Sequence, residues 1–187
     1  SCHYFITSKG KIVQMVPDSY TAWHAGKSRW KHHKSLNYYS IGIEISNPGH
    51  EHGYKKFTDK QISSLIEISK ILIKKYKIKK KNILGHSDVA PLRKKDPGEK
   101  FPWKHLYKNN IGFWYSINSK KKISSRDEKL KLNLDIFKDH LKKIGYRIEY
   151  SNSVQLKKLI KIFQMRFRPR LINGKLDLEC YKIAKSL

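Results

Sequence analysis

The sequence has few acidic residues, few cysteines and no long apolar run. Its 187 residues include 15 Asp and Glu against 41 Lys and Arg, which gives a formal net charge of +26. No apolar run approaches the ~18 residues of a membrane-spanning helix, so the sequence predicts none. The two cysteines, Cys2 and Cys180, lack the close spacing of a metal-binding motif. We expect free thiols in a core, and a disulfide only if the two ends of the chain meet.

The excess of positive charge suits an anionic partner. Nucleic acid and anionic polymers of the cell envelope are both candidates, and a general bias of composition toward lysine is a third explanation. Tight binding with a steep salt dependence would mark a nucleic-acid protein. No nucleic-acid motif accompanies the charge, so we rank this function last and predict no nucleic-acid partner.

The first 114 residues mix strand patterns with helix patterns. Short apolar runs bounded by turn residues predict strands at residues 2–7, 11–16, 40–46 and 83–84, and the third of these is expected to be buried. Thr58 and Gln61 have the spacing of a capping box, and a helical apolar stripe runs from there to Tyr76. A short helix is expected near residues 103–107. Mixed elements of this kind predict an α/β domain over residues 1–114.

The composition changes after residue 114. Residues 115–127 are polar and rich in lysine and serine, which is typical of a linker. Three amphipathic helices are predicted after it, at residues 128–144, 153–168 and 177–186. Gly145 ends the first, Pro169 follows the second, and Asp177 caps the third. Residues 128–187 therefore predict a compact three-helix module.

A short loop from Gly85 to Gly98 contains the most informative chemistry. It brings His86, Lys94 and Asp96 close together in the sequence. Histidine and carboxylate are good ligands for a catalytic zinc ion, which makes a bound water acidic enough to attack an amide. A lysine two positions before the carboxylate could place positive charge beside an oxyanion. His86 alone would be interpreted as an ordinary loop or core histidine, so the combination carries the prediction.

Glu44 is an acid inside an otherwise apolar strand. A buried carboxylate is costly unless it has a task or a partner. One interpretation makes Glu44 a general acid and base that moves a proton during catalysis. The other makes it a salt-bridged or edge-facing glutamate, and on this sequence the two have equal weight.

A long polar loop, residues 17–37, precedes that strand. Trp23 offers a flat apolar face for a sugar or a peptide, and His24 offers a hydrogen bond. Simple packing within the loop is the alternative for both residues. We add Asn37, at the end of the loop, to Trp23 and His24 as a predicted substrate-binding residue.

The order of these motifs resembles the zinc-dependent N-acetylmuramoyl-L-alanine amidases of the second amidase type, relatives of the peptidoglycan recognition proteins. The resemblance is carried by residues 1–6, 22–26, 40–45, 85–91, 94, 96–98 and 101–103. It implies a mixed central β-sheet flanked by helices. It also implies hydrolysis of the amide between N-acetylmuramic acid, or its 1,6-anhydro form, and L-alanine in peptidoglycan or muropeptides.

The resemblance also implies roles for individual residues. His86 and Asp96 match zinc ligands, Glu44 matches the general acid and base, and Lys94 matches the oxyanion stabiliser. Trp23 and His24 match residues that line the substrate groove.

The second half resembles a helical peptidoglycan-binding module. This resemblance is carried by residues 144–146, 163–169 and 173–174. An amidase joined to such a module is similar to envelope-facing amidases whose bacterial examples are outer-membrane lipoproteins. The resemblance therefore implies a monomer in the periplasm or cell envelope, with membrane contact only through a lipid anchor before Ser1.

One departure from the family concerns the third zinc ligand. The family's remaining ligand is a histidine on a strand that would precede Ser1. We expect either a fragment that lacks an N-terminal strand and helix, or a protein that has lost a ligand. The alternative function is then a non-catalytic peptidoglycan-binding protein. A histidine about 20–30 residues upstream would favour the enzyme.

Overall fold

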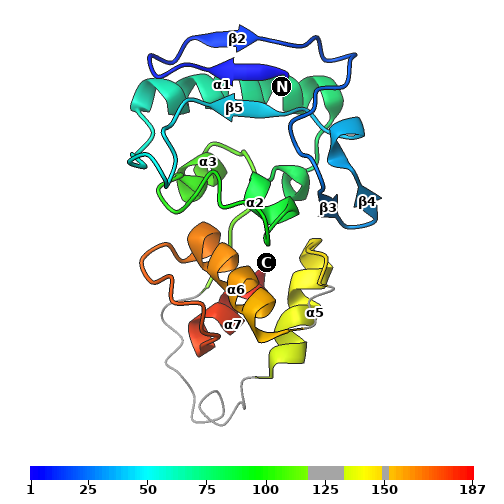
Figure 1. Cartoon of the computed structure of the whole chain (residues 1–187), viewed down its shortest axis with the longest axis vertical. Helices are drawn as coiled ribbons and strands as arrows, with labels where there is room; N and C mark the ends of the chain where they lie inside the picture. Colours follow the sequence, from blue (N-terminus) through cyan, green and yellow to red (C-terminus); the bar gives the residue numbers. More distant parts are fainter. Residues whose placement is uncertain (118–132, 149–151) are drawn as a thin grey trace.

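A small mixed β-sheet forms one end of the molecule (Figure 1). The computed structural model describes residues 1–117, 133–148 and 152–187. The strands of this sheet are β1 (Tyr4–Ile6), β2 (Ile12–Gln14) and β5 (Ile43–Ile45), in the order β2-β1-β5. Strand β1 runs antiparallel to β2 and parallel to β5. The expected mixed sheet and its first two strands are confirmed, with shorter bounds.

Helix α1 (Asp59–Tyr76) packs against the sheet (Figure 1). Its first turn has the predicted capping box, in which the Thr58 hydroxyl accepts from the Gln61 N–H and the Gln61 side chain accepts from the Thr58 N–H. Its buried face carries Ile62, Leu65, Ile68 and Leu72, which join Ile6 of β1 in one hydrophobic core. Burial of this stripe holds the helix to the sheet, and its lysines remain in water.

The strand predicted at residues 40–46 is also confirmed, with shorter bounds, as Ile43–Ile45, but its predicted burial is wrong because Glu44 at its centre is exposed. In the described part of the chain, β5 pairs with β1 alone, so one of its edges has no strand beside it. The strand predicted at residues 83–84 is wrong, because these residues form none. They follow the 3-10 turn η2 (Lys80–Asn82), and the Ile83 carbonyl accepts a hydrogen bond from Arg166 instead of from a neighbouring strand.

The loop over residues 17–37 contains structure that the sequence pattern did not predict. A two-stranded hairpin forms from β3 (Arg29–Trp30) and β4 (His33–Lys34), followed by the 3-10 turn η1 (Leu36–Tyr38). Two short helices, α2 (His86–Val89) and α3 (Trp103–Lys108), lie between the sheet and the other half of the molecule (Figure 1). The helix expected near residues 103–107 is thereby confirmed.

The other half of the molecule, the helical half, consists of helices α5 (Leu134–Ile144), α6 (Ser153–Phe167) and α7 (Leu178–Ser186). Gly145 ends α5 and Asp177 caps α7, as expected. The expected start of the first helix at residue 128, and most of the predicted linker at 115–127, lie outside the described residues. No helix in the described ranges is long and apolar enough to cross a membrane.

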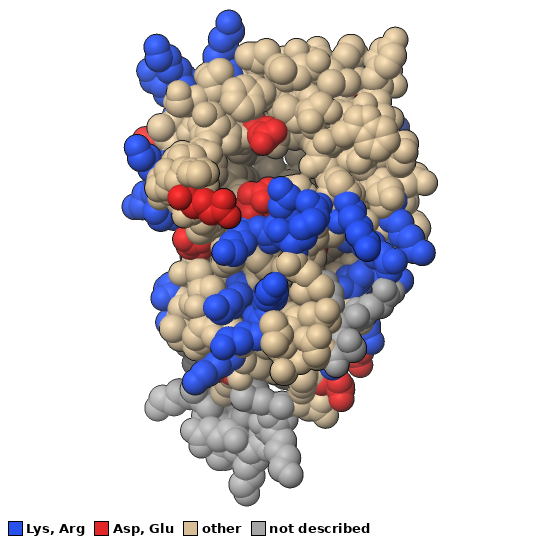
Figure 2. Space-filling view, viewed as in Figure 1, with Lys and Arg blue, Asp and Glu red and all other residues tan. Residues whose placement is uncertain are grey.

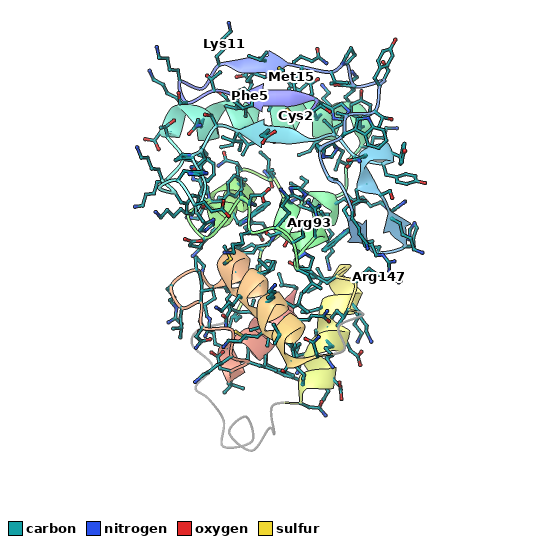
Figure 3. The ribbon with its side chains drawn as sticks, viewed as in Figure 1. Cys2, Phe5, Lys11, Met15, Arg93 and Arg147 are labelled. Carbon is teal, nitrogen blue, oxygen red and sulfur yellow. The ribbon has the colours of Figure 1, made fainter. Side chains whose placement is uncertain are left out.

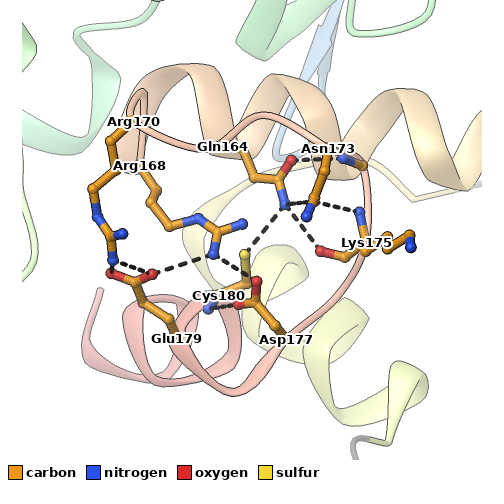
Figure 4. Close-up of polar contacts among 9 residues, drawn as sticks. Gln164, Arg168, Arg170, Asn173, Lys175, Asp177, Glu179 and Cys180 are labelled. Atoms are coloured by element: carbon orange, nitrogen blue, oxygen red, sulfur yellow. Dashed lines mark hydrogen bonds and ion pairs between the residues drawn. The ribbon is translucent and has the colours of Figure 1, made fainter.

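Polar contacts fix the connection between α6 and α7 (Figure 4). The buried Gln164 side chain donates to the Asn173 side chain and to the Lys175 carbonyl, and accepts from the Gly174 N–H. Arg168 forms ion pairs with Asp177 and Glu179. These bonds tie a turn with no regular structure to the helix before it.

The two halves share a hydrophobic core. Trp30 of the β3–β4 hairpin lies edge-on to Tyr146, with ring centres 5.0 Å apart, and Phe113 lies 5.8 Å from Phe167. The same buried cluster contains residues on both sides of the gap at 118–132. Cys180 belongs to it, and Cys2 is buried elsewhere. Both thiols are free, as expected.

Candidate active site

His86, the first residue of α2, faces Asp96 in the loop between α2 and α3. The Nδ1 atom of His86 lies 3.0 Å from Oδ2 of Asp96, and the Ser87 N–H donates to the Asp96 carbonyl, which closes the loop. Burial alone would raise the pKa of Asp96. The hydrogen bond with His86 and the electrostatic interactions with His86 and Lys94 outweigh it, so this pKa lies below its ordinary value. The carboxylate is therefore ionised at neutral pH.

Nδ1 of His86 faces an oxygen acceptor, whereas Nε2 faces both an acceptor, the Ala25 carbonyl, and a donor, the Arg93 guanidinium. Nε2 lies 3.1 Å from the Ala25 carbonyl, while Nδ1 faces the Asp96 carboxylate. A neutral imidazole has one N–H and can satisfy only one of these two acceptors. If Nε2–H donates to Ala25, a lone pair on Nδ1 meets a lone pair on the carboxylate, and a cation between them would satisfy both. Backbone carbonyls commonly orient metal-binding histidines in this way.

The Ala25 backbone links three parts of the site. Its carbonyl lies 3.1 Å from Nε2 of His86 and accepts, at 2.7 Å, from Arg93. Its N–H donates to the Asn37 side chain at 2.7 Å. Asn37 is only 6% exposed, so it holds the backbone beside His86. Its predicted contact with substrate stays a prediction.

Arg93 belongs to the site although the sequence did not single it out. Figure 3 places it beside α2, between the sheet and the helical half. Its guanidinium donates to the carbonyls of Ala25 and Lys27 and lies 3.3 Å from Nε2 of His86. The two carbonyls are more than 60 positions away in the sequence. His86 is seven positions away, so only the place of Arg93 between His86 and Lys94 could have suggested a role.

Trp23 and His24 flank the same backbone segment. Trp23 is 63% exposed and meets Tyr38 edge-on. His24 is half-buried, and its Nε2 lies 3.3 Å from the Ser40 carbonyl. Burial lowers the pKa of His24, and electrostatic interactions with His3 and His86 lower it further, which together outweigh the hydrogen bond to Ser40, so its ring is neutral at pH 7. An exposed indole beside a neutral imidazole is compatible with the predicted sugar or peptide contact.

Lys94 lies near the His86–Asp96 pair, whereas no contact links Glu44 to it. The charge of Lys94 contributes to the lowered pKa of Asp96. Glu44 is exposed on β5, opposite Phe5 in the sheet register, so the premise of a buried carboxylate is wrong. Within the described residues, Glu44 forms no hydrogen bond or ion pair with His86 or Asp96.

The opposite side of the loop is fixed by Asp88, which the sequence did not identify. Its carboxylate accepts from the Gly85 N–H at 2.7 Å and from the Tyr146 hydroxyl at 2.5 Å, and pairs with Arg166. The Arg166 guanidinium stacks 3.9 Å from the centre of the Trp103 ring. The helical half thus contributes two side chains that hold the backbone on both sides of His86.

Comparisons with known proteins point to one family. The family described as N-acetylmuramoyl-L-alanine amidase matches residues 1–99. The N-acetylmuramoyl-L-alanine amidase AmiD of Escherichia coli is 35% identical over 201 residues, which cover 100% of this chain and 73% of AmiD. The 1,6-anhydro-N-acetylmuramyl-L-alanine amidase AmpD of Escherichia coli is 41% identical over 103 residues, which cover 55% of this chain and 54% of AmpD. This chain therefore spans about half the length of AmpD.

Solved structures extend the similarity to both halves. AmpDh3 from Pseudomonas aeruginosa superposes with a TM-score of 0.93 at 32% identity, covering 100% of this chain and 81% of that one. AmiD from Escherichia coli, in complex with the substrate anhydro-N-acetylmuramic acid-L-Ala-D-γ-Glu-L-Lys, superposes with a TM-score of 0.85 at 33% identity. This superposition covers 100% of this chain and 78% of the AmiD chain. These matches include both the half that contains the sheet, which is the amidase half, and the helical half.

Proposed function

Because the chain belongs to the N-acetylmuramoyl-L-alanine amidase family, we propose that it hydrolyses the amide between N-acetylmuramic acid, or its 1,6-anhydro form, and L-alanine. The observation that carries this proposal is the His86–Asp96 pair at 3.0 Å, with the Asp96 side chain 57% exposed. A nitrogen and a carboxylate oxygen at this separation, open to solvent, suit a site for hydrolysis at a metal.

Two side chains of the site have the chemistry of zinc ligands. His86 and Asp96 would hold the ion, and the Ala25 carbonyl would fix the imidazole ring with Nδ1 toward it. A bound zinc ion would supply a water molecule with a pKa near ~7. A catalytic zinc site takes three protein ligands. Among the described residues, no group of three His, Cys, Asp or Glu side chains could hold a metal, so the proposal assigns two ligands.

The remaining roles are assigned to Glu44, Lys94, Trp23 and His24. Glu44 accepts a proton from the attacking water and passes it to the amine of L-alanine as the carbon–nitrogen bond breaks. Lys94 stabilises the negative charge on the carbonyl oxygen in the tetrahedral transition state. Trp23 and His24 contact the sugar or the peptide. These assignments are supported by the exposure of Glu44 and Trp23 and by the charge of Lys94 beside Asp96.

A second candidate function is peptidoglycan binding without cleavage. It is favoured by the same finding, that the described residues contain no third ligand near His86 and Asp96. Such a protein would bind muropeptides and release no product. For either function we propose the cell envelope as the location, because polymeric peptidoglycan lies there.

The test is cleavage of anhydro-N-acetylmuramyl tripeptide by the zinc-loaded protein, followed by mass spectrometry for free tripeptide. We expect release by the native protein, and a loss of about a thousandfold, or ~4 kcal/mol, in His86→Ala. His50→Ala is the matched control, because His50 forms a similar exposed pair with Glu99 at 2.9 Å. Binding without release, by folded protein that contains zinc, would exclude the amidase and favour the second candidate.

A further inference from the structure

A shallow groove lies where the two halves meet, next to the candidate active site. Its volume is about 150 Å3. It is lined on one side by residues 91–95, which follow α2, and on the other by α6 and Ile172. Lys94 is among the lining residues, so the groove begins at the reacting loop and continues onto the helical half.

The groove has an apolar floor and a positively charged rim. Apolar atoms dominate its lining, and the rim carries Arg93, Lys94, Lys95, Lys158 and Lys161. No acidic side chain lines it. Lys95, Lys158 and Lys161 are exposed and form no ion pair with any residue that the structure describes. Like charges around one hollow repel each other, and a bound anion would relieve that repulsion.

Figure 2 shows that this charge belongs to a larger surface. Lysine and arginine side chains form a band from the centre to the right of the visible face, where the two halves meet, and acidic side chains lie at its left end. The molecule is basic throughout, but here the charge surrounds an apolar hollow instead of covering a flat helix face. That combination favours a ligand with both carboxylates and alkyl groups.

The chemistry of the lining favours an acidic peptide over a nucleic acid. Sites for single-stranded nucleic acid place aromatic side chains under the bases, and no aromatic residue lines this groove. The substrate in the AmiD complex contains a γ-linked glutamate, which leaves one carboxylate free, and its last residue carries another. Peptidoglycan contains many such peptides close together on one polymer.

We propose that the groove binds a neighbouring, uncleaved stem peptide of the polymer through its carboxylates, while the active site holds the peptide that is cut. This inference rests on the proposed function for the identity of the polymer. Half of the groove comes from α6 and Ile172, whereas AmpD, an amidase for a 1,6-anhydro substrate, matches only 55% of this chain. The groove therefore serves attachment to the polymer, and cleavage of a single soluble fragment does not require it.

The experiment compares two double variants of the full chain on two substrates. Lys158→Glu with Lys161→Glu reverses the charge of the groove, and Lys70→Glu with Lys74→Glu makes the same change on the exposed face of α1. Co-sedimentation with insoluble peptidoglycan measures attachment, and release of tripeptide from the soluble fragment measures the active site. We expect the groove variant to lose about tenfold in affinity for the polymer, because two surface ion pairs with carboxylates contribute about that much to binding. The α1 variant should stay within roughly twofold of the native protein at the same salt concentration.

Several outcomes would overturn the proposal. Equal losses in both variants would show that only net charge matters, and unchanged binding in the groove variant would remove the site. A parallel loss of soluble-fragment cleavage would assign the groove to the reacting peptide. Loss of binding to a single-stranded DNA oligonucleotide, with polymer binding retained, would assign it to nucleic acid. If the native protein cleaves nothing, the proposed activity fails, but the polymer-binding comparison still decides the role of the groove.

Discussion

Two aspartates in the segment from Gly85 to Gly98, Asp88 in α2 and Asp96 in the loop that follows, have opposite surroundings. The Asp88 side chain is 1% exposed, pairs with Arg166 and accepts from Tyr146, so the helical half encloses it. The Asp96 side chain is 57% exposed and faces His86. The difference shows how the molecule divides its tasks. One side of the segment is fixed by buried charge, and the other side is left open for a ligand.

The energies of the two ion pairs differ for the same reason. A buried charge that loses its partner costs several kcal/mol, because no water replaces the lost contact. An exposed pair contributes about 0–1 kcal/mol to stability, since water screens it. Changes at Asp88 should therefore appear in the free energy of unfolding, and changes at Asp96 should appear in activity and metal binding.

The largest effect on stability is expected for Asp88→Asn. The change leaves the Arg166 guanidinium buried without its counter-charge, so the free energy of unfolding should fall by about 3–5 kcal/mol. Urea denaturation followed by circular dichroism measures it. The same change at the exposed Asp139, which pairs with Lys142, is the control. A loss below about 1 kcal/mol at Asp88 would contradict the structural role.

The next effect is expected for Asp96→Asn, which removes a charge without changing the shape of the side chain. We expect tripeptide release to fall at least about a hundredfold, or ~2.7 kcal/mol, with a matching loss of bound zinc measured by mass spectrometry. The free energy of unfolding should change by less than about 1 kcal/mol, because the side chain is mostly exposed. Retained zinc and activity would show that the carboxylate has no part in the site.

Asp18 sharpens the comparison, because it is enclosed like Asp88 but lies away from His86. Its carboxylate accepts from Tyr4, Tyr76 and Lys75. Burial would raise its pKa, but these bonds lower it from 3.8 to about 2. The stabilisation is complete above pH ~4 and is lost as the pH falls through ~2, for a total of roughly 2 kcal/mol. Acid unfolding of the native protein and of Asp18→Asn should differ in this range, and identical profiles would contradict the lowered pKa.

The smallest effect is expected for Tyr146→Phe, which removes one hydroxyl from Asp88 and leaves the ion pair in place. We expect a loss of about 1 kcal/mol in the free energy of unfolding. Activity should fall less than in Asp96→Asn, because Arg166 still holds the loop. If the loss of activity, expressed as a free energy of activation, exceeds the loss in the free energy of unfolding, the Tyr146 hydroxyl is needed to position His86 and the ion pair with Arg166 is not sufficient.

Features set by neighbouring residues could be predicted from the sequence. The capping box of Thr58 and Gln61 and the cap at Asp177 depend on residues three positions apart, and both are observed. His86 and Asp96 are ten residues apart in a loop closed by backbone bonds, so their pairing followed from the motif.

Features set by distant contacts could not be predicted. Asp88 and Arg166 are 78 positions apart, and nothing local marks them as partners. The apolar neighbours of Glu44 left two interpretations open, a buried acid with a task and a salt-bridged or edge-facing glutamate, because exposure depends on what covers that face of the sheet. Residues 83–84 have the composition of a strand and form none, since a strand needs a neighbour with which to pair.

The most direct measurement is the nitrogen spectrum of the histidine rings during addition of zinc to metal-free protein. We expect the Nδ1 signal of His86 to shift as zinc binds, while its Nε2 stays protonated toward the Ala25 carbonyl and the signals of His50 stay in place. If the signals of His86 do not change while the folded protein takes up zinc elsewhere, the His86–Asp96 pair is not the metal site.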